Sequence, residues 1–201
     1  MTVIDYFIFI DSLYTYLGSH RFIELVARYD VEVRTKPTRY RDIFAATGGQ
    51  MPEDRSPQRR AYRRMELQRW REALDIPIVL APTVFPAEEI LGNRLVIATA
   101  LAKLDTIRLT LEIGRSLWEQ DKNIDDWTVL REAARRAGLD ADKIRNEGPS
   151  DDALDQTVTR NTTEAIARGV FGAPSYVFEN GDVVWGQDRL QFVEMKLASM
   201  A

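Results

Sequence analysis

The stretch FIFIDSLYTYLG, residues 7–18, sets an apolar run directly against a short hydroxyl-bearing junction and the start of a helical pattern. Residues 3–10 (VIDYFIFI) are apolar on both alternating faces except at Asp5, which is typical of a strand buried on both sides. A helical pattern over residues 13–29 follows, and VEVRT from Val31 predicts a second strand. Strand, helix and strand in this order form a βαβ unit, so the sequence predicts an α/β fold.

The next segment changes character. Residues 37–56 hold several glycines and prolines and predict a loop with one helical turn near Ile43. Ser56 followed by Pro57 combines a hydroxyl N-cap with proline at the first helical position. These two residues therefore predict the start of a helix that reaches about Leu74.

The rest of the chain is predicted to be a helical block followed by a return to α/β patterning. Three or four helical patterns run over residues 87–146, and a helix is expected over 152–168. The two β-rich runs SYVF and DVVW flank Asn180-Gly181, a strong hairpin signal. A last helix is expected over residues 187–199.

This order indicates one α/β domain that is interrupted by a large, all-helical insertion. We assign residues 1–56 and 152–201 to the α/β domain and residues 57–151 to the insertion.

Composition excludes several classes of protein. The chain has 201 residues, no cysteine and a single histidine, His20. Disulfides, thiolate metal sites and a protein-borne thiol are thereby excluded, and a histidine-based metal site or a Ser-His-Asp triad is disfavoured. The net charge of −4 does not suggest binding to nucleic acid or to an anionic membrane. The start MTVIDYFIFID is too short and acidic for a signal peptide, and no apolar stretch approaches a membrane span, so we expect a cytoplasmic protein.

Ser12 lies where the first strand ends and the first helix begins. In open α/β sheets ligands bind beyond such strand ends, and the first turn of a helix favours an anion. The simpler interpretation is that Ser12, or Asp11, only caps the helix.

Three further motifs are candidates for a binding site. Ala173-Pro174 stands just before a β-rich run; a trans bond is the ordinary case, whereas a cis turn would leave the Ala173 backbone free to pair with a peptide-like ligand. Gln187 and Asp188 are expected in the first turn of the last helix, where an acid complements the helix dipole or receives the amine of an amino-acid end.

The third motif is the arginine-rich stretch RSPQRRAYRRMELQRWR, residues 55–71. Such a run is usually a solvated helix face that pairs with acids. One or two arginines near the start of the helix could still hold a ligand carboxylate in a bidentate manner.

Together these segments resemble a known family. FIFIDSLYTYLG, KPTRYRDIFAATGG, SPQRRAYRRMELQRW and RGVFGAPSYVF…VVWGQDRL occur in the order and at the spacing of the 2-hydroxychromene-2-carboxylate isomerases, which are related to kappa-class glutathione transferases and DsbA-like thioredoxin-fold proteins. The resemblance implies a thioredoxin-like domain with a helical insertion, a homodimer, glutathione as cofactor and a small aromatic 2-oxo or hydroxy carboxylate as substrate. Where thioredoxin relatives carry Cys-x-x-Cys, this chain reads Ser12-Leu13-Tyr14-Thr15, so it cannot exchange disulfides itself.

The resemblance also assigns roles to residues. Ser12 matches the serine that donates a hydrogen bond to the glutathione sulfur, and Pro174 matches a cis proline that leaves the Ala173 backbone to pair with the cysteinyl part. Gln187 and Asp188 match the positions that receive the γ-glutamyl end. Arg59 falls where members carry a lysine near the glycyl carboxylate.

Substrate contacts are less closely matched. Lys36, Arg39 or Arg41 is a candidate for the substrate carboxylate. Leu13 replaces a proline that usually follows the serine, and Gly49 replaces an asparagine that contacts ligands in many members. The sequence therefore leaves three interpretations open: a glutathione-dependent isomerase, a kappa-like transferase or peroxidase, and a non-catalytic thioredoxin-fold binding module.

Overall fold

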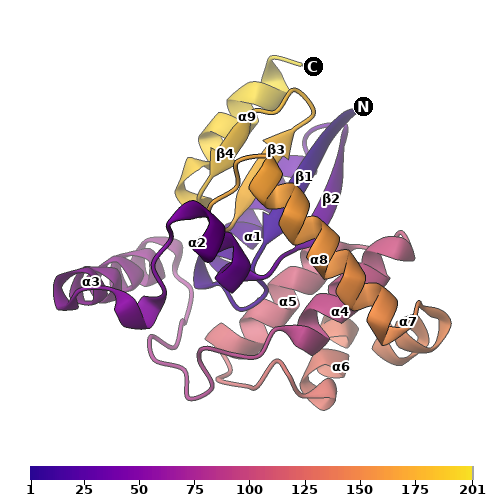
Figure 1. The fold of residues 1–201 in the computed structure, drawn as a ribbon, viewed down its shortest axis with the longest axis horizontal. Coiled ribbons are helices and arrows are strands. Elements are labelled where there is room, and N and C mark those ends of the chain that lie inside the picture. Colours follow the sequence, from indigo (N-terminus) through magenta and orange to yellow (C-terminus); the bar gives the residue numbers. More distant parts are fainter. Residues whose placement is uncertain (201) are drawn as a thin grey trace.

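A four-stranded mixed sheet forms the centre of the computed structural model, which describes residues 1–200 (Figure 1). The strand order is β2-β1-β3-β4. β1 pairs in parallel with β2 and antiparallel with β3, and β3 pairs antiparallel with β4. The strands are β1 (Thr2–Ile8), β2 (Val31–Pro37), β3 (Ser175–Phe178) and β4 (Val183–Trp185).

Helices make up most of the remaining chain. They are α1 (Leu13–Val26), α2 (Tyr40–Thr47), α3 (Pro57–Leu74), α4 (Ile90–Leu101), α5 (Thr106–Trp118), α6 (Trp127–Arg136), α7 (Ala141–Glu147), α8 (Asp151–Ala167) and α9 (Leu190–Ala198), with 3₁₀ turns at Pro52–Asp54 and Gln187–Arg189. None of the helices in this described part is long and apolar enough to cross a membrane.

The central strand explains the apolar run at the start of the sequence. Every residue from Val3 to Ile10 is buried, because side chains of β1 point alternately into two cores. One core lies against α2 and α8 and receives Phe7 and Phe9. The other lies against α1, α9 and the helices of the 90–144 region and receives Ile4 and Ile8.

Most predicted elements are confirmed, but several of them differ from the prediction in their bounds or length. β1 ends at Ile8 rather than residue 10, and α1 ends at Val26 rather than residue 29, because the chain turns through 27–30 to enter β2. The segment 37–56 holds a helix of eight residues, α2, where one turn was predicted. Its apolar residues pack onto the α8 side of the sheet, and the packing stabilises a helix that local propensity does not indicate.

The last helix begins differently from the prediction. Residues 187–189 form a 3₁₀ turn, and α9 starts at Leu190. Gly186, with φ of +104°, lets the chain leave β4 and enter this turn.

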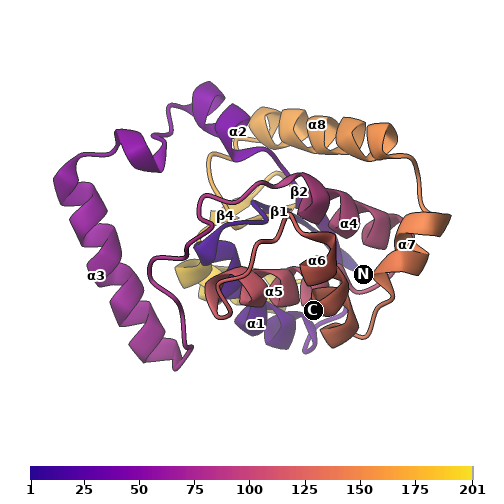
Figure 2. The ribbon, with the colours of Figure 1, turned by 90° about the horizontal axis from the view of Figure 1, so that it is seen from below.

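The α/β class and the thioredoxin-like architecture with additional helices are as predicted. α5 packs against α1, and α4 packs against β2 and α8, so this part of the helical block covers the sheet domain directly. α3 lies apart from the other helices at one end of the molecule (Figure 2). The exact division at residues 57 and 151 stays a prediction.

Candidate functional site

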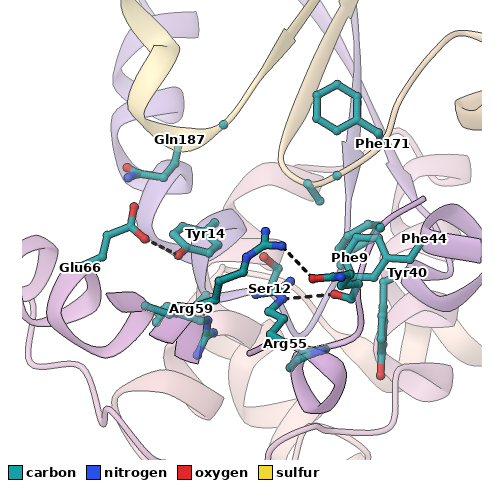
Figure 3. Close-up of a pocket in the computed structure, with 18 of the residues that line it drawn as sticks. Phe9, Ser12, Tyr14, Tyr40, Phe44, Arg55, Arg59, Glu66, Phe171 and Gln187 are labelled. Carbon is teal, nitrogen blue, oxygen red and sulfur yellow. Dashed lines mark hydrogen bonds between the residues drawn. The ribbon is translucent and has the colours of Figure 1, made fainter. Parts of the chain in front are cut away.

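A cavity of about 790 Å³ opens where β1 ends and α1 begins (Figure 3). Five segments far apart in the sequence form its walls: the short connection after β1 with the start of α1, the residues from α2 through the first half of α3, Phe85-Pro86, the loop before β3, and the end of β4 with the turn after it. Its size is within the range of cavities that bind small molecules. The cavity therefore lies at the strand end where the sequence predicted a ligand.

Ser12 is the N-cap of α1 and also lines the cavity. The Thr15 backbone N–H donates to Ser12 Oγ over 3.3 Å. A serine hydroxyl can accept one hydrogen bond and donate another, so capping leaves its proton available to an acceptor in the cavity. The capping and the ligand-binding interpretations of Ser12 are thus compatible.

The Ala173-Pro174 bond is cis, as the family resemblance implied and contrary to the ordinary trans preference. β3 begins with Ser175, which pairs with Phe7 of β1. Ala173 therefore lies before the β1–β3 ladder, and it lines the cavity. Beside it, a Cβ on Gly172 would lie 2.6 Å from Trp185 Nε1. The Trp185 indole therefore packs directly on the Gly172 backbone, while the Ala173 backbone at the cavity wall lies outside the β1–β3 ladder.

The turn after β4 brings Gln187 and Asp188 to the same cavity. Gln187 is 2% exposed, and Arg21 donates to both its backbone and its side-chain oxygen. The Asp188 carboxylate is partly exposed and pairs with Arg189 over 2.9 Å. Asp188 is thus free to exchange its neighbour for a ligand amine, while Gln187 is already bound through its oxygen atoms.

Arg59 lines the cavity and donates to Gln50 Oε1 over 2.7 Å. Arg55 and Arg63 line it too. Burial, followed by the positive charges of Arg63 and Arg59, lowers the pKa of Arg55. Such mutual repulsion between guanidinium groups is relieved by a bound anion. The cluster is accordingly suited to a ligand with carboxylate groups.

Aromatic side chains complete the lining, and sequence reasoning did not identify them. They are Phe9, Tyr14, Tyr40, Phe44, Tyr62, Phe85, Phe171 and Trp185. In the sequence they are scattered over five segments, so no local signal joins them. Together they provide an apolar surface for a planar ring.

The three predicted substrate residues lie elsewhere. Lys36 pairs with Asp5 over 3.0 Å and with Glu164 over 2.6 Å and does not line the cavity. Arg39 and Arg41 line a separate, smaller cavity of about 230 Å³. Lys36 is held in these two ion pairs, and none of the three residues is part of the wall of the cavity that holds Ser12.

The two departures from the family pattern both lie in the cavity wall. Leu13 is 1% exposed and belongs to the core. At Gly49 a Cβ would lie 2.6 Å from Phe44 Cδ1, so an asparagine there would displace the phenyl ring. Phe44 therefore occupies space beside the position where many family members present an amide.

Asp11 is the residue whose environment the sequence least revealed. It directly precedes Ser12, lines the cavity and is only 5% exposed. Burial raises the pKa of the Asp11 carboxyl well above its ordinary value, against the opposing effects of its own backbone N–H and of Arg41 and Arg63.

Comparisons with known proteins agree with the fold described above. The family model of the DsbA-like thioredoxin domain matches residues 3–198. A 2-hydroxychromene-2-carboxylate isomerase of Sphingobium xenophagum is 28% identical over 198 residues, which cover 98% of this chain and 97% of the relative. One of Pseudomonas sp. (strain C18) is 26% identical over 198 residues, covering 96% and 89%.

Solved structures show the same fold. A 2-hydroxychromene-2-carboxylate isomerase superimposes with a TM-score of 0.77 at 22% identity, covering 98% of this chain and 95% of that one. The cytosolic disulfide reductase DsbM of Pseudomonas aeruginosa, in a structure with GSH, gives a TM-score of 0.67 at 17% identity and covers 98% and 99%.

Proposed function

Because the chain belongs to the family of the DsbA-like thioredoxin domain yet contains no cysteine, we propose that it is a glutathione-dependent isomerase of the 2-hydroxychromene-2-carboxylate isomerase type. The names of the curated relatives support isomerase activity on a small aromatic carboxylate. The observation that carries the proposal is the position of Ser12: a hydroxyl at the start of α1 opens onto a cavity of about 790 Å³ where cysteine-bearing relatives hold a thiol.

The residues of the cavity fit glutathione. The free backbone at Ala173 suits the cysteinyl part, the Arg59 guanidinium suits the glycyl carboxylate, and Asp188 suits the amine of the γ-glutamyl end. Bound glutathione would supply a thiolate that adds reversibly to an unsaturated carbon, so that rotation about the resulting single bond converts cis to trans.

The role of Ser12 follows from its surroundings. A free thiol titrates near 8.5, and a hydroxyl donor together with the N–H groups of a helix start lowers that pKa by about one to several units. Ser12 would therefore keep the sulfur ionised at neutral pH. We assign the substrate carboxylate to Arg55 or Arg63, in place of Lys36, Arg39 or Arg41, since Arg55 and Arg63 line the same cavity as Ser12 and the aromatic side chains.

Two measurements test the proposal. Titration calorimetry with glutathione should give binding below millimolar concentration, whereas no binding would favour a non-catalytic module. Turnover of a 2-hydroxychromene-2-carboxylate should leave the free thiol concentration constant. Depletion of the thiol would instead identify a kappa-like transferase or peroxidase, and would overturn the isomerase assignment.

A further inference from the structure

Asp11 is a buried acid for which the proposed function has no role. Asp11 lines the large cavity one residue before Ser12, in the short connection between β1 and α1. Aspartate is almost never as buried as this unless it is paired with a cation. None of the ion pairs within the described residues includes it. A carboxyl group in such a place holds a proton more readily than one in water.

A second carboxyl group belongs to Glu89, the N-cap residue of α4. Glu89 lines the smaller cavity, and Tyr40 and Pro86 line both cavities, so the two adjoin. Glu89 Oε1 is buried without a hydrogen-bond partner in the described structure, as is Oδ1 of Asn93, which also lines the smaller cavity. Glu89 therefore has an oxygen atom that is free to bind a proton.

The two carboxyl groups interact. Burial raises the pKa of Glu89, and the negative charge of Asp11 raises it further. Two carboxyl groups in a poorly hydrated site do not both ionise, and they titrate as a pair that shares a proton. The other titratable groups that face the pair from α2, α3 and the segment before α4 are Arg39, Tyr40, Arg41, Arg63 and Glu88.

We propose that Asp11 is a catalytic acid–base residue of the large cavity and that Glu89 is a positioning residue that shares its proton. This inference rests on the proposed function. If bound glutathione supplied the thiolate, its addition would move an electron pair from the carbon–carbon double bond to the conjugated carbonyl oxygen, and Asp11 would donate its proton to that oxygen. After rotation, Asp11 would take the proton back as the thiolate leaves and the double bond re-forms. No proton, electron or thiol is consumed.

The phenol of Tyr14, which also lies near Ser12 in the sequence, is less suited to donate this proton. Tyr14 lines the cavity, but its hydroxyl donates to Glu66 over 2.9 Å. Burial, followed by the negative charge of Glu66, raises the pKa of Tyr14 above its ordinary value. A general acid works best when its pKa lies near the operating pH, and a buried carboxyl group meets this condition more closely than a phenol.

The first test does not depend on activity. The carboxyl resonances of protein labelled with ¹³C-aspartate and ¹³C-glutamate are followed by NMR from pH 4 to 9 without glutathione, in the wild type, D11N, E89Q and the control D42N. Asp42 is an exposed carboxylate of α2. We expect one aspartate to titrate near neutral pH, to vanish in D11N, to shift in E89Q and to persist unchanged in D42N. An Asp11 that stays ionised throughout this range overturns the proposal.

The second test uses turnover together with glutathione affinity. D11N should bind glutathione as the wild type does, by calorimetry, and lose about 10²–10⁴-fold in kcat. E89Q should move the pH profile of kcat and alter its magnitude less. A D11N protein with wild-type kcat and pH profile overturns the role of Asp11 and leaves the proposed function standing. A wild type that binds glutathione but does not isomerise the chromene overturns both.

Discussion

Replacement of Ser12 separates its capping role from its role toward sulfur. Ser12→Ala removes the acceptor of the 3.3 Å hydrogen bond from the Thr15 backbone N–H. Loss of an N-cap of this kind costs about 1 kcal/mol, whereas replacement by glycine costs only a few tenths of a kcal/mol. For a chain of 201 residues, 1 kcal/mol lowers Tm by about 2–4 °C. Thermal unfolding should therefore place Ser12→Ala below Ser12→Gly, with Ser12→Gly close to the wild type.

The chemistry should rank these variants differently. Both variants lack the hydroxyl group that donates to sulfur. Both should therefore raise the pKa of the thiol group of bound glutathione by about one unit or more and reduce turnover strongly. Ultraviolet absorbance of the thiolate against pH measures the first effect, and initial rates measure the second. If Ser12→Gly kept wild-type turnover, or if activity followed Tm across the two variants, the reasoning about sulfur would be refuted.

The remaining predictions concern affinity, packing, pH and assembly. Arg59→Gln should weaken glutathione binding about 10–100-fold in calorimetry, because hydrogen bonds to charged groups contribute about 1.5–3 kcal/mol. Arg64→Gln, at an exposed position of α3, is the control. Equal affinities of the two variants would show that Arg59 does not bind glutathione. Gly114→Ala should lower Tm, because the Cβ of the alanine would lie 2.7 Å from Tyr16 Cδ2. Overpacking of this kind costs about 1–3 kcal/mol, which exceeds the gain of about 1 kcal/mol in helix propensity. An unchanged or higher Tm would argue against this contact between α1 and α5. Burial raises the pKa of Asp11, so the stability that its protonated form contributes is complete below about pH 4 and is lost as pH rises toward neutrality. In urea unfolding, the free energy of unfolding of the wild type should fall relative to that of Asp11→Asn over this range. Parallel pH dependences of the two proteins would contradict this prediction. Analytical ultracentrifugation should give twice the chain mass of 23.0 kDa, as the family resemblance implies, and a monomer at micromolar concentration would contradict the homodimer.

Local chemistry in the sequence was sufficient for much of the fold. The N-cap at Ser56 with Pro57 starts α3 as predicted, and Asn180-Gly181 joins β3 to β4. These signals succeed because caps and tight turns depend on the backbone preferences of the residues themselves. α2 was underestimated because a helix of eight residues is stabilised mainly by the core against which it packs.

The candidate site divides in the same way. Ser12, Ala173, Asp188 and Arg59 were found from motifs, and all four line one cavity. Lys36, a candidate for the substrate carboxylate, pairs instead with Asp5 and Glu164, and no local pattern in the sequence indicates these two ion pairs.

The sequence by itself determined the α/β order, the absence of a protein thiol and the hydroxyl at the start of the first helix, because these depend on residue type and near neighbours. Only the tertiary structure decided which cations and aromatic rings share a cavity with Ser12. It also buries Asp11 close enough to Glu89 for the charge of Asp11 to raise the pKa of the Glu89 carboxyl group. Burial and charge interactions join residues that are distant in sequence, and they act only once the sheet and its helices have brought those residues together.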